Sequence, residues 1–103
     1  MAHETLHEPL EKLSPDTLDI HRAISSLMEE FEAVDWYQQR VDACQDPALK
    51  AVLAHNRDEE IEHAAMVLEW LRRKLPRLDK ELREYLFTEG SITGHEAETM
   101  GRD

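Results

Sequence analysis

The sequence predicts an all-α fold, in which a hairpin of two long antiparallel helices is followed by a short C-terminal helix. Apolar residues recur at helical spacing, and the 103 residues include only 3 Gly and 4 Pro. A chain of this length suits one small domain. Its expected parts are a flexible N-terminus at residues 1–13, the helical hairpin domain at residues 14–89 and a flexible C-terminal tail at residues 90–103.

The first long helix is expected to begin at Pro15 and to end near Cys44. Ser14, Pro15 and Asp16 form a helix start, with a serine N-cap, a proline at the first helical position and an acid in the first turn. Apolar side chains then recur at helical spacing, and they are Leu18, Ile24, Leu27, Met28, Phe31, Val34, Tyr37 and Val41.

The second long helix is expected from Pro47 to about Leu75. Asp46 and Pro47 repeat the N-cap and first-position signal. At the other end, residues 72–74 are all basic, which suits the negative end of a helix dipole. The short connection between the two helices makes them antiparallel. A third, shorter helix is expected at about residues 77–87.

A hairpin of two helices has only one shared face, so it cannot enclose a core by itself. Two such hairpins can pair to form a four-helix bundle. The sequence therefore predicts an obligate dimer at least, with a four-helix bundle as the folded unit.

Charge and composition exclude several classes of function. Twelve Lys and Arg stand against 23 Asp and Glu, a net charge of −11, and such a chain repels nucleic acid and anionic membranes but attracts cations. No apolar run is long enough to span a bilayer. Cys44 is the single cysteine, so no intrachain disulfide is possible. We expect a cytoplasmic protein with neither nucleic-acid nor membrane partners.

Polar residues interrupt the packing face of both long helices. Residues three and four apart share a helix face. On the second helix such a row is Leu49, Leu53, Asn56, Glu60, His63, Val67 and Trp70. On the first helix the row is Ala23, Leu27, Glu30, Val34, Tyr37 and Val41. Burying an unpaired charge is costly, so carboxylates in such rows are normally paired or bound to metal, unless they reach solvent at the edge of the row.

Glu30, Glu60 and His63 together have the composition of half a di-iron site. Di-iron carboxylate bundles take a lone glutamate from each of two helices and a Glu-x-x-His motif from each of two others. One hairpin supplies one of each, and a two-fold axis would supply the second set. Carboxylates and imidazole suit iron and leave positions open for oxygen or peroxide. Zinc or manganese could use the same ligands.

A second acidic row on the first helix contains Ser25, Glu29, Glu32 and Trp36. Two acids without a base between them could gather a cation near the route to the centre. The alternative is a solvated acidic face, although an exposed tryptophan beside it hints at an interface.

On the second helix, His55 and Glu59 form an i, i+4 pair, which we interpret as a surface ion pair rather than a metal site. The neighbouring acids Asp58, Glu59 and Glu62 are expected to be solvated or to lie at subunit contacts.

Several stretches of the sequence closely resemble the encapsulated ferritins. They are MEEFEAVDWY at residues 28–37, HNRDEEIEHAAM at 55–66, LEWLRR at 68–73 and YLFTE at 85–89. The resemblance extends from about His7 to Ile92. It implies a ferritin-like ferroxidase of two-helix subunits, assembled as a ring-shaped decamer. By position, the implied iron ligands are Glu30, Glu60 and His63, contributed by both chains at a subunit interface.

The resemblance also implies roles for other residues. Glu29, Glu32 and Trp36 match a site through which iron, or another divalent cation, enters. Tyr37 matches a tyrosine close to the iron centre. The implied partner is an encapsulin shell, which receives the oxidised iron as mineral. Family members usually carry a Gly/Leu/Ser-rich targeting peptide after a flexible linker, and residues 90–103 contain no such stretch.

Our preferred hypothesis is a ferroxidase that oxidises Fe(II) with dioxygen at a di-iron site between two subunits, inside an encapsulin compartment. Two alternatives are considered. A rubrerythrin-like peroxide reductase often uses a rubredoxin-type iron, which Cys44 alone cannot bind. A metal-free acidic helical cargo or adaptor protein would use the acidic rows only as surface.

Overall fold

The structure of the protein is a computed structural model that describes residues 6–100, except for the side chains of residues 97–100. Its elements are the 3-10 helix η2 (Leu10–Lys12) and the helices α1 (Pro15–Ala43), α2 (Pro47–Lys74), α3 (Pro76–Tyr85) and α4 (Ile92–Met100). The predicted all-α fold is confirmed.

The chain divides into two compact units, Met1–Leu71 and Arg72–Asp103. None of the described helices is both long and apolar enough to cross a membrane.

The predicted helix start at Ser14 is confirmed. The side chain of Ser14 accepts a hydrogen bond from the backbone N–H of Thr17 at 3.1 Å, and Pro15 is the first residue of α1. α1 ends at Ala43, where the backbone N–H of Cys44 donates to the carbonyl oxygen of Arg40. The helix is therefore defined at both ends by the residues that the sequence pattern indicates.

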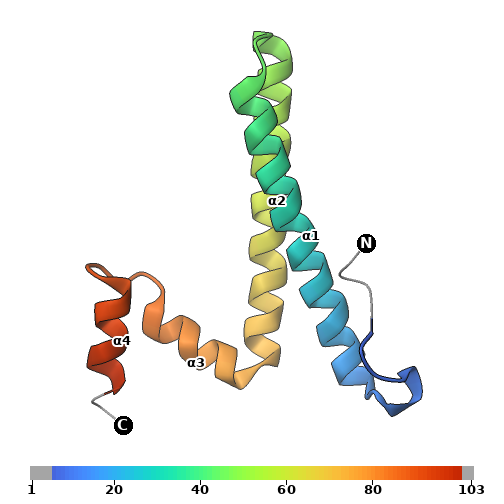
Figure 1. Ribbon diagram of the computed structural model, residues 1–103, viewed down its shortest axis with the longest axis vertical. Coiled ribbons are helices and arrows are strands. Elements are labelled where there is room, and N and C mark those ends of the chain that lie inside the picture. The colour runs from blue at the N-terminus through green and yellow to red at the C-terminus, as the bar shows by residue number, and fades with distance from the viewer. Residues whose placement is uncertain (1–5, 101–103) are drawn as a thin grey trace. The chain divides into compact units, whose positions relative to one another are not determined.

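A short turn at residues 44–46 brings α2 back antiparallel to α1 (Figure 1). Asp46 caps α2, because its Oδ2 atom accepts a hydrogen bond from the backbone N–H of Leu49 at 2.8 Å. Further along the hairpin, Nη1 of Arg57 on α2 donates to Oε1 of Gln38 on α1 at 2.8 Å. The turn and this contact set the register in which the two polar rows face each other.

The hairpin buries few apolar side chains. Among the described residues, the buried apolar ones are Val41, Ala64 and Leu71. Much larger apolar side chains of α1 and α2 are exposed, namely Ile24, Met28, Phe31, Trp36, Leu49, Val52, Ile61, Met66 and Trp70. Exposed apolar surface of this kind usually marks an interaction surface.

In the second unit, charge pairs and one ring contact hold the helices. Arg72, in the last turn of α2, pairs with Asp79 of α3, and Nε of Arg83 donates to the same carboxylate at 2.9 Å. The rings of Tyr85 and His95 meet edge to face with their centroids 5.4 Å apart, which joins α3 to α4.

The C-terminal part differs from the sequence expectation. α3 ends at Tyr85, and Phe87, expected to be helical, has a φ of 62° that a right-handed helix does not allow. Residues 92–100 form α4, where the apolar pattern predicts a tail without a helix. The overlooked signal is Ser91, whose Oγ caps α4 by accepting from the backbone N–H of Gly94 at 3.0 Å.

The flexibility expected for the two termini stays a prediction. In the N-terminal segment, residues 10–12 form the single 3-10 turn η2. Residues 1–5 and 101–103, which belong to the two expected flexible segments, lie outside the described residues.

Candidate metal centre

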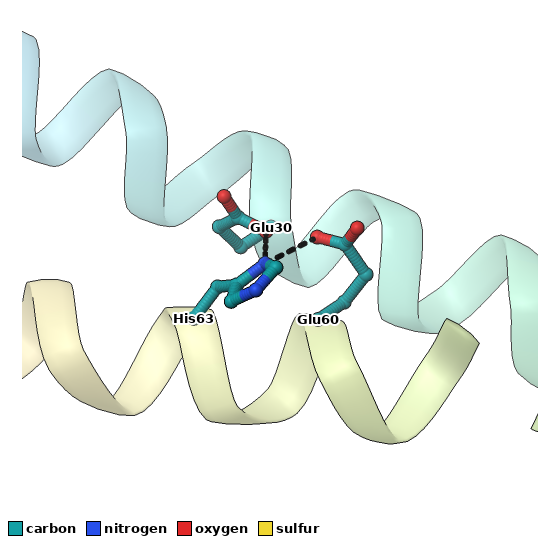
Figure 2. Close-up of side chains that lie close together, drawn as sticks. All are labelled: Glu30, Glu60 and His63. Atoms are coloured by element: carbon teal, nitrogen blue, oxygen red, sulfur yellow. Dashed lines mark ion pairs between the residues drawn. The ribbon is translucent and has the colours of Figure 1, made fainter. Parts of the chain in front are cut away.

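Three side chains from the two long helices converge at one place in the hairpin. Glu30 extends from α1, Glu60 and His63 extend from α2, and all three point toward one another (Figure 2). Nδ1 of His63 lies 3.6 Å from Oε2 of Glu30 and 3.7 Å from Oε2 of Glu60. In the part of the chain that the structure describes, this is the one group of three or more His, Cys, Asp or Glu side chains that could hold a metal ion.

Helix geometry explains why these residues meet. Glu60 and His63 are three residues apart and therefore lie side by side on α2. Glu30 faces them from α1 because the capped turn at Asp46 sends α2 back along α1. The two polar rows of the sequence thus become opposite sides of one small polar site.

The electrostatics of the site are unfavourable without a cation. Oε2 of Glu30 is buried and has no hydrogen-bond partner among the described residues. The close approach of the Glu60 carboxyl is the main cause that raises the pKa of Glu30, followed by burial and by the negative charge of Glu60, whereas His63 lowers it. Two neighbouring carboxylates repel each other when both are ionised, and a bound cation would remove that repulsion.

The donor set fits a transition metal. Carboxylate oxygen and imidazole nitrogen are ligands that iron, zinc and manganese accept. Bonds of about 2.0–2.2 Å from these donors to a metal ion place two of its ligands about 3 to 4 Å apart. The ligand atoms of Glu30, Glu60 and His63 all lie within 4.8 Å of one another, so small side-chain adjustments would let them share an ion.

Glu59 also lies against the ring of His63. Its Oε2 atom is 3.9 Å from Nε2 of His63, and its Oε1 atom is 3.2 Å from Nε2 of His55. The predicted surface pair between His55 and Glu59 is confirmed, since both side chains are well exposed. The contact of Glu59 with His63 was not predicted, although the i, i+4 spacing of the two residues is the signal for it.

The second acidic row stays apart from this group. Glu29 and Glu32 are partly buried, and Trp36 is 50% exposed. Within residues 6–96, whose side chains are described, neither acid joins two further His, Cys, Asp or Glu side chains in a cluster that could hold an ion. Metal entry at these three residues stays a prediction.

Tyr37 is partly buried on α1, and the guanidinium carbon of Arg40 lies 5.4 Å from the centroid of its ring. This is a cation–π contact, which fixes the ring against its own helix. The place of Tyr37 beside an iron centre stays a prediction.

Comparison with known proteins identifies the family. The sequence profile of the EncFtn-like family matches residues 5–89. A Rhodospirillum rubrum protein named "Encapsulated ferritin-like protein" is 67% identical over 96 residues, which cover 93% of this chain and 69% of that protein. A Thermotoga maritima protein named "Ferritin-like protein" is 55% identical over 95 residues, which cover 92% of this chain and 83% of that protein.

A solved structure has the same fold. The crystal structure of a Nitrosomonas europaea protein aligns with a TM-score of 0.82 and 64% sequence identity, over 84% of this chain and 96% of that one. The profile match spans both long helices and α3, and it includes every residue of the candidate metal centre. The chain therefore belongs to the EncFtn-like family of encapsulated ferritin-like proteins.

Proposed function

We propose that the protein is a ferroxidase, which binds Fe(II) at Glu30, Glu60 and His63 and lets dioxygen oxidise it to Fe(III). The observation that carries this proposal is the convergence of two carboxylates and one imidazole, with Oε2 of Glu30 buried and lacking a hydrogen-bond partner among the described residues. Iron is the substrate in this reaction. Each ferrous ion gives up one electron, and a pair of them with two protons reduces one dioxygen to hydrogen peroxide.

The residues of the site have distinct tasks in this proposal. The Glu30 and Glu60 carboxylates bind the cations and neutralise their charge, and His63 offers a nitrogen ligand that ferrous and ferric iron both accept. Because the pKa of Glu30 is raised, protons compete with a cation for this pair of carboxyl groups as the pH falls. Partial exposure of all three side chains leaves a path for dioxygen and water.

A complete di-iron site needs two chains. A di-iron bundle takes its ligands from four helices, and one hairpin provides two. A two-fold axis doubles the ligand set because both subunits present the same surface. Large apolar side chains flank the ligands on both helices: Phe31 beside Glu30 is 54% exposed, and Met66 beyond His63 is 58% exposed. A second copy of the chain is the partner that would cover them and complete the site.

We further propose that the dimers form a ring-shaped decamer, which is cargo of an encapsulin shell in the cytoplasm. Support comes from family membership and from the name of the Rhodospirillum rubrum relative. The shell would receive the oxidised iron as mineral. Glu29, Glu32 and Trp36 would admit iron or another divalent cation, and Tyr37 would lie close to the iron.

The proposal is tested by adding Fe(II) to the metal-free protein without oxygen and then admitting air. We expect saturation near one iron per chain, a rise in ferric absorbance faster than that of iron alone, and a larger assembly mass. Glu60→Ala and His63→Ala should lose the fast oxidation. Glu62→Ala is the matched control, because Glu62 is an exposed acid on the same helix. Oxidation no faster than the iron-only control, with unchanged mass, would contradict the proposal and favour a metal-free adaptor.

A further inference from the structure

We infer that α3 is a docking element for a second copy of the chain. Its exposed basic side chains, together with the apolar side chain of Phe87 that follows them, bind the acidic hairpin of the other copy. The contact involves none of the candidate metal ligands, so the inference goes beyond the proposed function and does not depend on iron.

Charge is distributed unevenly along the chain. Residues 72–83 contain six of the twelve Lys and Arg and two acids, whereas residues 1–71 contain 16 acids and five bases. The segment around α3 is therefore positive, although the chain as a whole has a net charge of −11. Surfaces of opposite charge attract each other between molecules, and such complementarity speeds association and fixes the register of a contact.

The bases of α3 lie on one exposed side of the helix. Arg77, Lys80 and Arg83 follow one another at a spacing of three residues and are all exposed, and we call them the basic ridge. Nε of Arg77 donates to Glu81 at 2.9 Å and Nε of Arg83 donates to Asp79 at 2.9 Å, which leaves further N–H donors on both guanidinium groups. Lys80 forms no ion pair with any described residue, so its ammonium group is available to an acid of another molecule.

An exposed aromatic side chain follows the basic ridge. Phe87 is fully exposed, at 102%, and its φ of 62° is rare for a bulky residue. The backbone around it is held in place, because the N–H of Leu86 donates to the carbonyl oxygen of Leu82 at 2.9 Å and Oγ1 of Thr88 donates to that of Tyr85 at 2.8 Å. Backbone strain of this kind occurs preferentially at functional sites. We interpret Phe87 as an anchor for a partner, since aromatic side chains often contribute much of the energy of an interface.

The hairpin offers a complement to both features. Its large exposed apolar side chains would cover Phe87, and its acids would pair with the basic ridge. Nucleic acid and anionic membranes fit less well, because the chain as a whole repels them. Each copy carries both surfaces, so two chains can form the contact in both directions. Exposed ion pairs contribute little individually, so we assign most of the binding energy to Phe87 and the orientation of the partner to the ridge.

The first test identifies what Lys80 contacts. A carbodiimide joins a lysine amine to a carboxyl group with loss of water, and it therefore reports close pairs of the two. Unlabelled and ¹⁵N-labelled full chains are refolded together from urea with a chelator present and then cross-linked. We expect peptides of mixed label that join Lys80 to acids of residues 14–71. Lys50, an exposed lysine of the hairpin, is the internal control. Mixed-label product at Lys80 no more abundant than at Lys50 would overturn the inference.

The second test measures self-association by analytical ultracentrifugation with a chelator present. Glycine adopts a φ of 62° without strain, so Phe87→Gly should keep the helix content by circular dichroism. Its association should nevertheless weaken by about tenfold or more, because the anchor is lost. Wild-type association in Phe87→Gly would overturn the inference, as would a wild type that does not self-associate under these conditions.

A charge reversal on the ridge tests the electrostatic part of the contact. Lys80→Glu should weaken association, and its difference from the wild type should shrink at high salt. Lys50→Glu is the matched control, because it makes the same change of charge on the acidic hairpin and should not weaken association. Equal weakening in both variants would show general charge repulsion instead of docking by α3.

These tests separate the inference from the proposed function. If Lys80 cross-links between chains while the wild type oxidises Fe(II) no faster than iron alone, the ferroxidase proposal fails and docking by α3 stands. If the wild type oxidises Fe(II) rapidly but Phe87→Gly and Lys80→Glu associate as it does, only the docking role of α3 fails.

Discussion

At the scale of single residues, the metal-free site brings together two carboxyl groups that repel each other when both are ionised. Glu30 and Glu60 bring two carboxyl groups together, and Oε2 of Glu30 is buried without a hydrogen bond from any described residue. A buried polar atom of this kind destabilises the fold unless something binds it. We interpret the arrangement as a site whose favourable state includes a cation.

The raised pKa of Glu30 predicts how the stability of the metal-free protein depends on pH. A carboxyl group with a folded-state pKa above its ordinary value of 4.5 favours folding below that pH, and its contribution is lost as the pH rises through the folded-state pKa. In Glu30→Gln the side-chain amide cannot ionise, so this variant does not lose stability as the pH rises. We therefore expect the variant to have a higher Tm than the wild type near neutral pH, with the difference shrinking toward pH 4.5.

Thermal unfolding of both proteins over this pH range, with a chelator present, measures the effect. Glu62→Gln controls for removal of one negative charge from the hairpin, because Glu62 is exposed on α2. A difference between wild type and Glu30→Gln that did not change with pH would show that ionisation of Glu30 is not its cause.

The same reasoning applies to loading of the site. A cation competes with protons for the carboxyl groups, so its binding should release protons and should weaken as the pH falls. We expect a measurable proton release when Zn(II) or anaerobic Fe(II) is added to the wild type in weak buffer, and a smaller release from Glu30→Gln. Equal release from both proteins would exclude Glu30 as the source.

At the scale of single elements, capping residues fix where the long helices begin. Asp46 accepts a hydrogen bond from the backbone N–H of Leu49 and precedes Pro47, so it defines both the start of α2 and the end of the turn. The position of this start sets the register that brings Glu60 and His63 opposite Glu30.

Removal of this cap should therefore destabilise the hairpin. Asp46→Ala leaves the Leu49 N–H without its partner, and loss of an N-cap typically costs about 1 kcal/mol. Asp46→Asn keeps an acceptor and should cost much less. Urea unfolding of both variants at one protein concentration gives the two values. Equal losses in the two variants would attribute the effect to charge and not to the cap.

Charge pairs stabilise α3 within the second unit. Asp79 accepts from Arg72 and Arg83, and these two guanidinium groups lower the pKa of its carboxyl below the ordinary value of 3.8. The contribution of the Asp79 carboxylate to folding stability is present above pH 3.8 and is lost as the pH falls through the folded-state pKa. We expect Asp79→Asn to reduce amide hydrogen-exchange protection in α3 at neutral pH. Protection equal to that of the wild type would show that these pairs do not hold the helix.

At the scale of the whole molecule, more of the hairpin's large apolar side chains are exposed than buried among the described residues. Val41, Ala64 and Leu71 are its buried apolar residues among those the structure describes, whereas Phe31 and Met66 beside the site are more than half exposed. The proposed pairing of two chains would cover this surface and would complete the ligand set. Assembly and function are therefore coupled in our proposal.

The substitution Phe31→Lys should prevent two chains from associating through this face. The substitution places a charge in the apolar surface next to Glu30, which a second hairpin would have to bury. Asp42→Lys is the matched control, because Asp42 is an exposed residue of the same helix. Analytical ultracentrifugation should show a smaller species for Phe31→Lys and no change for Asp42→Lys. If Phe31→Lys kept the wild-type mass, this face would not be the subunit interface.

Much of the fold follows from the sequence alone. Proline and capping residues at the starts of α1 and α2 mark them to the residue, because these signals are local and act through the backbone. Glu30, Glu60 and His63 are also predictable, because helical period places each in an otherwise apolar row. The end of α3 and the existence of α4 could not be predicted from the sequence. The backbone of Phe87 has a positive φ, which ends the helical conformation, and the cap at Ser91 is not followed by an apolar stripe that would indicate a helix.

The tertiary structure alone decides which polar residues share a site. The sequence cannot measure the separation of Glu30 from His63, because it depends on the turn and on the packing of α1 against α2. Nor does it show that Glu59 faces Nε2 of His63 while the candidate ligands face Nδ1, since this depends on side-chain rotamers. Local signals determine the helices, whereas the orientation of one imidazole ring depends on neighbours from two of them.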